Sequence, residues 1–421
     1  MIEEVTIENY KSIQSLTLPL GRVTVLIGEN GCGKSNILEA IALGSVAAGN
    51  NNKNLLAGRG IRLTEAKLMR SCFQLENATK NIKTSFKFDD NQIFYYDLSH
   101  DNNPYSQWEV KTLLSENLID QLIGQLATDE EQEIFKELNE LNELKDKMLI
   151  QVLTQEKDSN NYPNPMVVKA FNTIKMITIQ SKINKSEELK TIYFESFYYQ
   201  WMANFYIFCP QFIGLRNFEE DENNLPLGVN GEGLFKYIKY LGLKENQKEI
   251  IEIKEKLELI DWFEDFDVPD NLYPGEKTLK IKDRYLDPDL EYFDQKSANE
   301  GFLFLLFYFC LFIGEETPRF FAIDNIDSSL NPRLCSRLVE ELVELAKKHD
   351  KQVILTTHNP AILDGLDLHD DEQKLYVIRR KLNGETRADR VSPLKPPKGK
   401  DPVRLSEAFL RGYIGGLPEN F

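Results

Sequence analysis

Short apolar runs bounded by glycine or polar residues predict the buried strands of an α/β fold. Residues 23–27 and 320–323 are such runs, and a third ends at His358. Runs of this length that are apolar, or apolar apart from threonine, are typical of strands covered on both faces. Phe302 to Ile313 is a longer run that predicts a buried helix, and it falls short of the roughly 20 apolar residues that span a bilayer. We therefore expect a sheet flanked by helices and no membrane span.

Alternating apolar and polar residues between Gln74 and Leu98 predict an antiparallel hairpin. Its turn is expected at Asp89-Asp90-Asn91, where the chain is polar and contains the residues that favour tight turns.

Residues 116–205 carry a helical pattern. Apolar residues recur there at spacings of four, three and seven over about two heptads, at Ile134, Leu138, Leu141 and Met148. This is far too short for a long coiled-coil arm. It predicts a short helical hairpin or bundle, which either binds a partner or packs on its own neighbours.

The segment GENGCGKS, from Gly28 to Ser35, lies between a predicted strand and a predicted helix and fits the pattern G-x-x-x-x-G-K-[ST]. Glycines let such a loop wrap a phosphate closely, while its amides and the helix N-terminus supply partial positive charge. An ordinary glycine-rich turn is the alternative, but the full motif in this context favours ATP and Mg²⁺. The predicted nucleotide contacts are Gly28, Asn30, Gly31, Cys32, Gly33, Lys34, Ser35 and Asn36.

Asp324 follows the apolar run 320–323, so its carboxylate is expected at the tip of a buried strand. Carboxylate and hydroxyl oxygens are ligands that Mg²⁺ accepts, directly or through water. Ser35 and Asp324 are therefore the predicted metal ligands.

The opening strands and the loop GENGCGKSN resemble the N-terminal lobe of the ABC-type ATPases related to RecF, SMC and the OLD family, which are grouped loosely with AAA-type ATPases. The resemblance implies a P-loop NTPase head of the ABC type. Such a head has a mixed sheet flanked by helices and an antiparallel β subdomain, and here it would carry an α-helical insertion.

Downstream segments follow the order that this family requires. Asn299-Glu300-Gly301 resembles the signature segment that faces the γ-phosphate bound by a second subunit, although a plain helix N-cap also explains Asn299. Asp327 to Pro332 resembles the loop that crosses a dimer interface, the D-loop. His358 resembles the switch histidine that contacts the γ-phosphate, with a structural histidine as the alternative.

Asn325 stands where most relatives have a glutamate that polarises the attacking water. An amide cannot accept a proton at neutral pH, and losing a general base costs about 10²- to 10⁴-fold in rate, roughly 3 to 5 kcal/mol. We therefore expect tight Mg·ATP binding with slow turnover, Asn325 orienting water with help from His358 or Asp327. Alternatively, Asn325 only hydrogen-bonds a neighbouring loop.

The formal charge of −17 argues against a surface that attracts nucleic acid generally. Residues 374–411 are the exception, with eleven basic residues against four acidic ones. They could contact a nucleic acid backbone or an acidic partner, and a solvated surface is the simplest interpretation.

Five cysteines, at positions 32, 72, 209, 310 and 335, lack metal-ligand spacing, which predicts reduced thiols. The acidic start of the chain lacks a secretory pattern, so a cytoplasmic protein is expected.

The predicted domains are an N-terminal ATPase lobe (1–112), a helical insertion (113–270), a C-terminal ATPase lobe (271–373) and a basic hairpin with a docking tail (374–421). The tail offers no second active site of the kind found in OLD nucleases.

Stand-alone ATPases of this design occur in bacterial anti-phage systems. The resemblance thus implies a nucleotide-gated sensor or scaffold that forms a homodimer or higher oligomer through its ATP sites and controls a separately encoded effector, a nuclease or a toxin. A DNA-repair ATPase of the RecF or SMC kind is the main alternative. The nucleotide subunit of a membrane transporter is disfavoured by the modified signature and the insertion.

Overall fold

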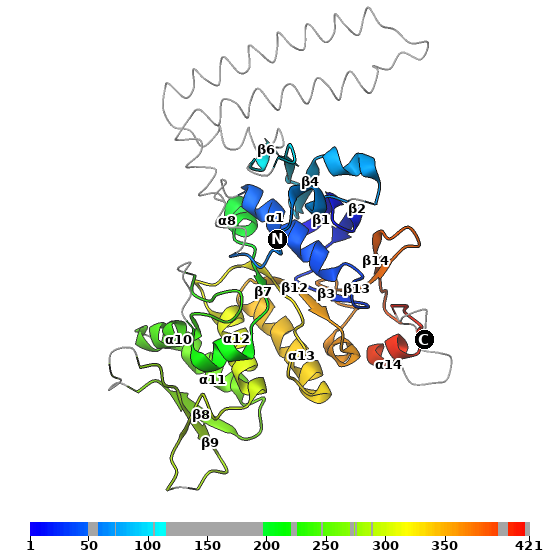
Figure 1. The fold of residues 1–421 in the computed structure, drawn as a ribbon. Helices are drawn as coiled ribbons and strands as arrows, with labels where there is room; N and C mark the ends of the chain where they lie inside the picture. Colours follow the sequence, from blue (N-terminus) through cyan, green and yellow to red (C-terminus); the bar gives the residue numbers. More distant parts are fainter. Residues whose placement is uncertain are drawn as a thin grey trace, which may run out of the picture.

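The computed structural model describes residues 1–48, 58–71, 73–103, 106–114, 197–219, 225–245, 247–269, 273, 276–287, 289–394 and 403–416. In Figure 1 a five-stranded and a three-stranded sheet lie at opposite ends of the described chain, with a six-stranded sheet between them. The predicted helical pattern around residues 134–148 lies outside the described residues, as do the basic residues at 395, 398 and 400.

The five-stranded sheet is antiparallel and has the order β2-β1-β4-β5-β6. Its strands are β1 (Ile2–Tyr10), β2 (Ile13–Pro19), β4 (Ile82–Phe88), β5 (Ile93–Ser99) and β6 (Glu109–Leu114). The β4–β5 pair is the predicted hairpin, and Asn91 takes a left-handed backbone conformation in its turn. The expected antiparallel β subdomain is confirmed.

The six-stranded sheet is mixed, with the order β14-β13-β3-β12-β11-β7. Its strands are β3 (Val23–Ile27), β7 (Ile207–Phe208), β11 (Phe320–Ile323), β12 (Gln352–Thr357), β13 (Gln373–Arg380) and β14 (Thr386–Arg390). All neighbours are parallel except β13 and β14. The predicted strands at 23–27 and 320–323 are confirmed. β7 belongs to this sheet although it falls within the segment predicted as an insertion.

Helix α1 (Lys34–Ala48) lies between the two larger sheets and is buried on nearly all sides. It contacts β1, β4 and β5 of one sheet and β12 and β7 of the other. Side chains alternate along β3: Leu26 packs in the core around α1, whereas Val25 and Ile27 pack in the core on the opposite face. A helix enclosed in this way needs no polar stripe, which explains its small and apolar sequence from Ala40 to Ala48.

Helix α12 (Glu300–Ile313) fills the core on the opposite face and is buried from Phe302 to Ile313, as the apolar run predicts. Helix α13 (Pro332–Lys348) shares this core and presents charged residues outward. No described helix is both long enough and apolar enough to cross a membrane.

Shorter elements complete the described chain. The three-stranded sheet, with the order β10-β9-β8, consists of β8 (Phe263–Asp267), β9 (Lys280–Asp283) and β10 (Phe293–Asp294). The remaining helices are α3 (Ala66–Met69), η1 (Leu75–Thr79), α8 (Phe197–Ala203), α9 (Phe212–Asn217), α10 (Leu234–Leu243), α11 (Lys248–Leu257), η2 (Pro360–Gly365) and α14 (Leu405–Leu410).

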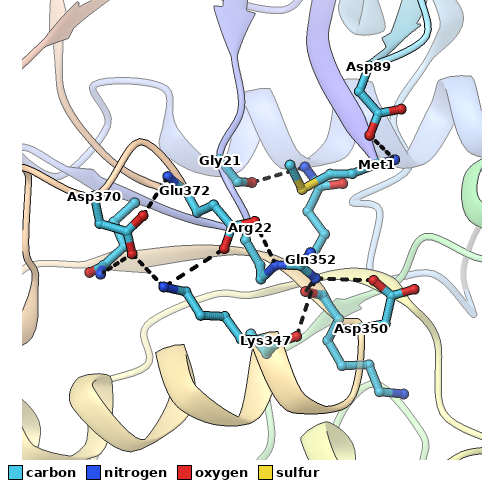
Figure 2. Close-up of polar contacts among 12 residues, drawn as sticks. Met1, Gly21, Arg22, Asp89, Lys347, Asp350, Gln352, Asp370 and Glu372 are labelled. Atoms are coloured by element: carbon cyan, nitrogen blue, oxygen red, sulfur yellow. Dashed lines mark hydrogen bonds and ion pairs between the residues drawn. The ribbon is translucent and has the colours of Figure 1, made fainter.

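Polar contacts join the elements where the parallel strands begin (Figure 2). The buried Gln352 side chain donates to the carbonyl oxygens of Ile2, at 2.7 Å, and Gly21, at 2.9 Å, and accepts from the Ile2 amide at 3.0 Å. Arg22 contacts Asp350 and Glu372 nearby. These contacts tie β1 and β3 to β12 at the end of the sheet opposite the glycine-rich loop.

Candidate nucleotide-binding site

The loop from Gly28 to Gly33 joins β3 to α1, so the predicted strand, loop and helix occur in that order. Gly31 has a φ of 76° and Gly33 a φ of 112°, which residues with a side chain rarely adopt. A Cβ on Gly28 would collide with the Ile378 carbonyl oxygen, and one on Gly33 would collide with the Thr386 hydroxyl. The motif glycines are therefore required by conformation and by close packing.

Lys34 is the first residue of α1, and its ammonium group contacts the backbone of the loop. It donates to the carbonyl oxygens of Gly28, at 2.8 Å, and Glu29, at 3.0 Å. Burial lowers the pKa of Lys34, although Cys32 and the carboxylate of Asp324 act in the opposite direction. The lysine is thus held at the position from which the motif predicts phosphate contact.

The two predicted metal ligands meet. The Ser35 hydroxyl donates to Asp324 Oδ2 at 3.0 Å, which joins the start of α1 to the end of β11. The other oxygen of this carboxylate accepts from the Thr356 hydroxyl. A hydroxyl and a carboxylate suit Mg²⁺, which usually keeps several waters and substrate phosphates as its other ligands. Among the described residues, no group of three or more His, Cys, Asp or Glu side chains could hold a metal ion.

Asn325 has a left-handed backbone with a φ of 59°. The backbone N–H of Asn325 donates to the Thr356 hydroxyl at 2.9 Å, and its backbone carbonyl accepts from the Ser328 hydroxyl at 2.8 Å. Asparagine is one of the few residues with a side chain that tolerates this conformation. The geometry thus gives a local reason for asparagine after the strand carboxylate.

Asp327 and His358 lie near the same strand ends. Asp327 accepts from the Thr357 hydroxyl at 2.6 Å, so it is tied to the end of β12, immediately before His358. Partial burial and the charge of Lys34 lower the pKa of His358, so its imidazole is neutral near pH 7. The charge of Lys34 thus acts on the predicted switch histidine.

The predicted signature and D-loop segments line a pocket that is separate from the glycine-rich loop. Its volume is about 740 Å³, and its lining includes Asn299, Gly301, Ser329 and Asn331. Residues 28–36 are not part of this lining within the described chain. Asn299 accepts from the Phe302 amide at 2.8 Å, so it does cap α12, as the simpler interpretation of this residue held.

Asn30 and Gly31 are exposed at the loop tip, whereas Cys32 is buried, and burial raises the pKa of its thiol. The four cysteines that are described are free thiols. Asn36 points its amide at the Ser12 hydroxyl, 2.6 Å away.

Sequence reasoning missed Ser12, Thr356, Thr386 and Arg380, all of which contact motif residues. Thr356 lies two residues before His358, and a polar residue there within a buried strand is a signal that could have been used. The contacts of the other three cross between distant parts of the chain, and the sequence offers no comparable signal for them.

A P-loop between a parallel strand and a helix, on a mixed sheet that an antiparallel β subdomain accompanies, defines this fold as an ABC-type P-loop ATPase head. The chain belongs to the RecF/RecN/SMC N-terminal domain family, whose model matches residues 1–381.

Solved structures of Smc heads are similar to this chain, and the first of them supports the fold. An Smc head crystallised with the C-terminal winged-helix domain of ScpA has a TM-score of 0.51 at 14% identity, over 93% of this chain and 98% of that one. An Smc head with an extended coiled coil, bound to the C-terminal domain of ScpA and derived from Pyrococcus furiosus, has a TM-score of 0.44 at 13% identity, over 93% and 96%. No curated protein matches the chain.

Proposed function

We propose that this protein binds Mg·ATP, hydrolyses it slowly, and acts in the cytoplasm as a nucleotide-gated sensor or scaffold that controls a separately encoded effector, a nuclease or toxin, in anti-phage defence. The observation that carries the nucleotide part is the contact of 3.0 Å between the Ser35 hydroxyl and Asp324 Oδ2, beside a complete phosphate-binding loop. The defence role rests on the resemblance of the motifs alone.

In this proposal each residue has a defined task. Lys34 and the loop amides bind the β- and γ-phosphates, and Ser35 and Asp324 hold Mg²⁺, which would neutralise phosphate charge. The side-chain amide of Asn325 positions the attacking water but cannot accept its proton. His358, neutral near pH 7, reaches the γ-phosphate as a hydrogen-bonding group. Slow turnover follows because none of these groups replaces the usual carboxylate base.

Association through the nucleotide is the second part. Asn299 and Gly301 line a pocket that the loop of the same chain does not reach. A head-to-tail homodimer would bring this pocket of one chain over the nucleotide held by another. ATP would then act as a bridge between the chains, and a higher oligomer could be built from such dimers.

The first experiment is calorimetric titration of Mg·ATP into wild type and Lys34→Ala. Losing a charge-assisted contact to phosphate should weaken binding by about 10- to 100-fold. Lys282→Ala is a matched control, since Lys282 pairs with Glu264 on the three-stranded sheet. If Lys34→Ala retains ATP affinity and the assembly state of wild type, the proposed function is wrong.

A RecF- or SMC-like DNA-repair ATPase is the second candidate, and the family match favours it. It requires hydrolysis that duplex DNA stimulates, so turnover with and without DNA ends separates the two functions. Neighbouring reading frames give a further test: a nuclease or toxin gene would support defence, and replication genes would support repair.

The fourfold division of the chain remains a proposal. The six-stranded sheet includes β7 from segment 113–270, and β14 and nearly all of β13 from segment 374–421, so both segments contribute strands to the ATPase core. If that division is real, the insertion and the tail are attached to the core through these strands.

A further inference from the structure

We infer that the β13–β14 hairpin is part of the phosphate-binding site, and that Arg380 and Thr386 are positioning residues that hold the glycine-rich loop in its phosphate-binding shape. The inference rests on the proposed function, because it concerns the loop that would bind ATP. The hairpin lies far from this loop in the sequence, in the segment predicted as a basic tail.

Thr386 closes a chain of hydrogen bonds around the base of the loop. Asn36 Nδ2 donates to Ser12 Oγ at 2.6 Å, the Ser12 and Thr386 hydroxyls are 2.7 Å apart, and Thr386 Oγ1 donates to the Cys32 carbonyl oxygen at 2.9 Å. Because Thr386 uses its proton on Cys32, Ser12 must donate to Thr386. The chain therefore has one direction, from the Asn36 amide to the Cys32 carbonyl.

Burial makes this chain costly to break. Ser12 and Thr386 are each 2% exposed and Cys32 is 4% exposed. A buried hydroxyl or carbonyl that loses its partner bears its desolvation cost, since water cannot replace that partner. The Thr386 hydroxyl is thus well suited to fix the orientation of the Cys32 carbonyl.

Arg380 holds the tip of the loop. Its Nε donates to the Gly31 carbonyl oxygen at 2.9 Å, and its NH1 donates to the Gly384 carbonyl oxygen, also at 2.9 Å. Its neighbours Arg379 and Lys381 instead pair with the carboxylates of Asp389, at 2.6 Å, and Glu385, at 2.7 Å. Arg380 has no carboxylate partner among the described residues, and its guanidinium lies over the Phe73 ring, 5.6 Å from the ring centroid.

Peptide planarity turns these two contacts into control of the loop amides. In a trans peptide the carbonyl of one residue and the N–H of the next point to opposite sides. Holding the Gly31 and Cys32 carbonyls toward the hairpin therefore directs the N–H groups of Cys32 and Gly33 away from it. The Cys32 amide does point across the loop, toward the Glu29 carbonyl at 3.4 Å. Inward-pointing amides of this kind form the phosphate cradle.

Steric fit supports the same assignment. Two of the motif glycines are crowded by this hairpin, Gly28 by the backbone of Ile378 and Gly33 by the side chain of Thr386. The glycine pattern of the loop thus reflects the surface of β13 and β14 as well as the phosphate.

The test compares ATP and ADP affinity in variants of the two residues. Thr386→Val removes the hydroxyl, and Arg380→Leu removes the donor to Gly31; each should weaken binding about tenfold, as expected for one lost hydrogen bond that orders the site. Thr386→Ser keeps the hydroxyl and should bind within about twofold of wild type. Arg387→Gln is the matched control, because Arg387 pairs with Asp389 on the same hairpin.

Kinetics distinguish positioning from a general loss of structure. Where turnover is measurable, the Thr386→Val and Arg380→Leu variants should show a raised KM with kcat close to wild type, whereas the Ser variant restores KM. Arg380 is exposed, so its variant tests the inference even if Thr386→Val fails to fold. Wild-type affinity in folded Arg380→Leu and Thr386→Val overturns the inference. Failure of the wild type itself to bind ATP would instead overturn the proposed function.

Discussion

Asn325 combines two properties that together set the expected rate of the site. Its amide side chain cannot accept a proton, and its backbone φ of 59° favours asparagine over glutamate. The usual catalytic residue would thus be strained here by about 1 kcal/mol or more. The backbone conformation thus favours asparagine at the position where the proposed slow hydrolysis depends on its amide side chain.

Asn325→Glu should therefore raise single-turnover hydrolysis, with a ceiling of about 10²- to 10⁴-fold set by general-base catalysis and a smaller gain in practice because of strain. Asn325→Gly is the control, since glycine accepts the backbone conformation without supplying a base and should leave the rate no faster than wild type. Rapid-quench measurement of ATP cleavage by preloaded protein gives the answer. A Glu variant that binds ATP normally yet cleaves it no faster would contradict the assigned role.

Residues that form one short motif could be predicted from the sequence. The segment from Gly28 to Ser35 is contiguous, so its strand, loop and helix context is visible without the fold. Ser35 and Asp324 could be assigned to one metal site from the sequence, because Ser35 lies at the start of a predicted helix and Asp324 directly follows a predicted strand. Thr386 carries no such signal, because its role depends on a contact with Cys32 made only in the folded chain.

At the scale of elements, the longer strands of the six-stranded sheet that are buried on both faces are ones that the sequence predicts. Strand β11 is a continuous apolar run and β3 is apolar except for Thr24, so their bounds were visible in the sequence. β7, by contrast, has only two residues, which is too short for any periodic pattern. Its place in the sheet is determined by pairing with β11.

Gln352 joins elements that the sequence places far apart, as Figure 2 shows. Replacing it with leucine would leave backbone groups of Ile2 and Gly21 without their partner in a buried site. We expect a loss of about 2 to 4 kcal/mol in the free energy of unfolding. Denaturant unfolding measures the change, with Gln107→Leu on the exposed surface as control. Equal stability of the two variants would show that the Gln352 contacts contribute little.

Lys351 hydrogen-bonds the loop after α12, and its contribution to stability is expected to depend on pH. It is 2% exposed and donates to the Gly314 carbonyl at 2.8 Å and the Thr317 carbonyl at 3.0 Å. Burial lowers its pKa to about 7, against roughly 10.4 for an unfolded chain. Between these values the unfolded state binds more protons, so the contribution of Lys351 to stability rises with pH.

The stability of wild type relative to Lys351→Met should therefore increase as pH rises from about 7 to about 10, on the order of a few kcal/mol. Urea unfolding of both proteins across this range isolates the contribution of one lysine. Lys282→Met, at a surface ion pair, should show a nearly constant difference from wild type. A flat profile for Lys351→Met would mean that the buried ammonium is as stable as a solvated one.

At the scale of the whole molecule, ion pairs offset part of the positive charge of the basic segment 374–411. The sequence places eleven basic residues between 374 and 411, but Arg379, Lys381 and Arg387 pair with Asp389 or Glu385. The hairpin is thus less attractive to a polyanion than its basic count suggests. With a net charge of −17, two copies also repel each other, so any assembly needs a specific bridge.

Gly301 offers a direct test of that bridge. A Cβ at this position would lie 3.5 Å from Leu330 and 3.6 Å from Asn299, which are ordinary contacts, so Gly301→Ala should fold normally and keep its own ATP affinity. The added methyl would nevertheless obstruct the pocket that should cover the phosphate bound by another chain. We expect ATP-dependent association, measured by sedimentation, to weaken about tenfold, a change of about 1.4 kcal/mol.

Gly242→Ala on α10 is the matched control, because a Cβ there meets nothing within 4 Å and should leave association unchanged. Lys34→Ala supplies the opposite comparison, since it should lose both ATP affinity and assembly. If Gly301→Ala assembles with ATP as wild type does while Lys34→Ala does not, then ATP drives association through a surface other than the signature pocket. Weakened assembly in Gly301→Ala, with ATP affinity retained, would separate the covering role of α12 from the binding role of α1.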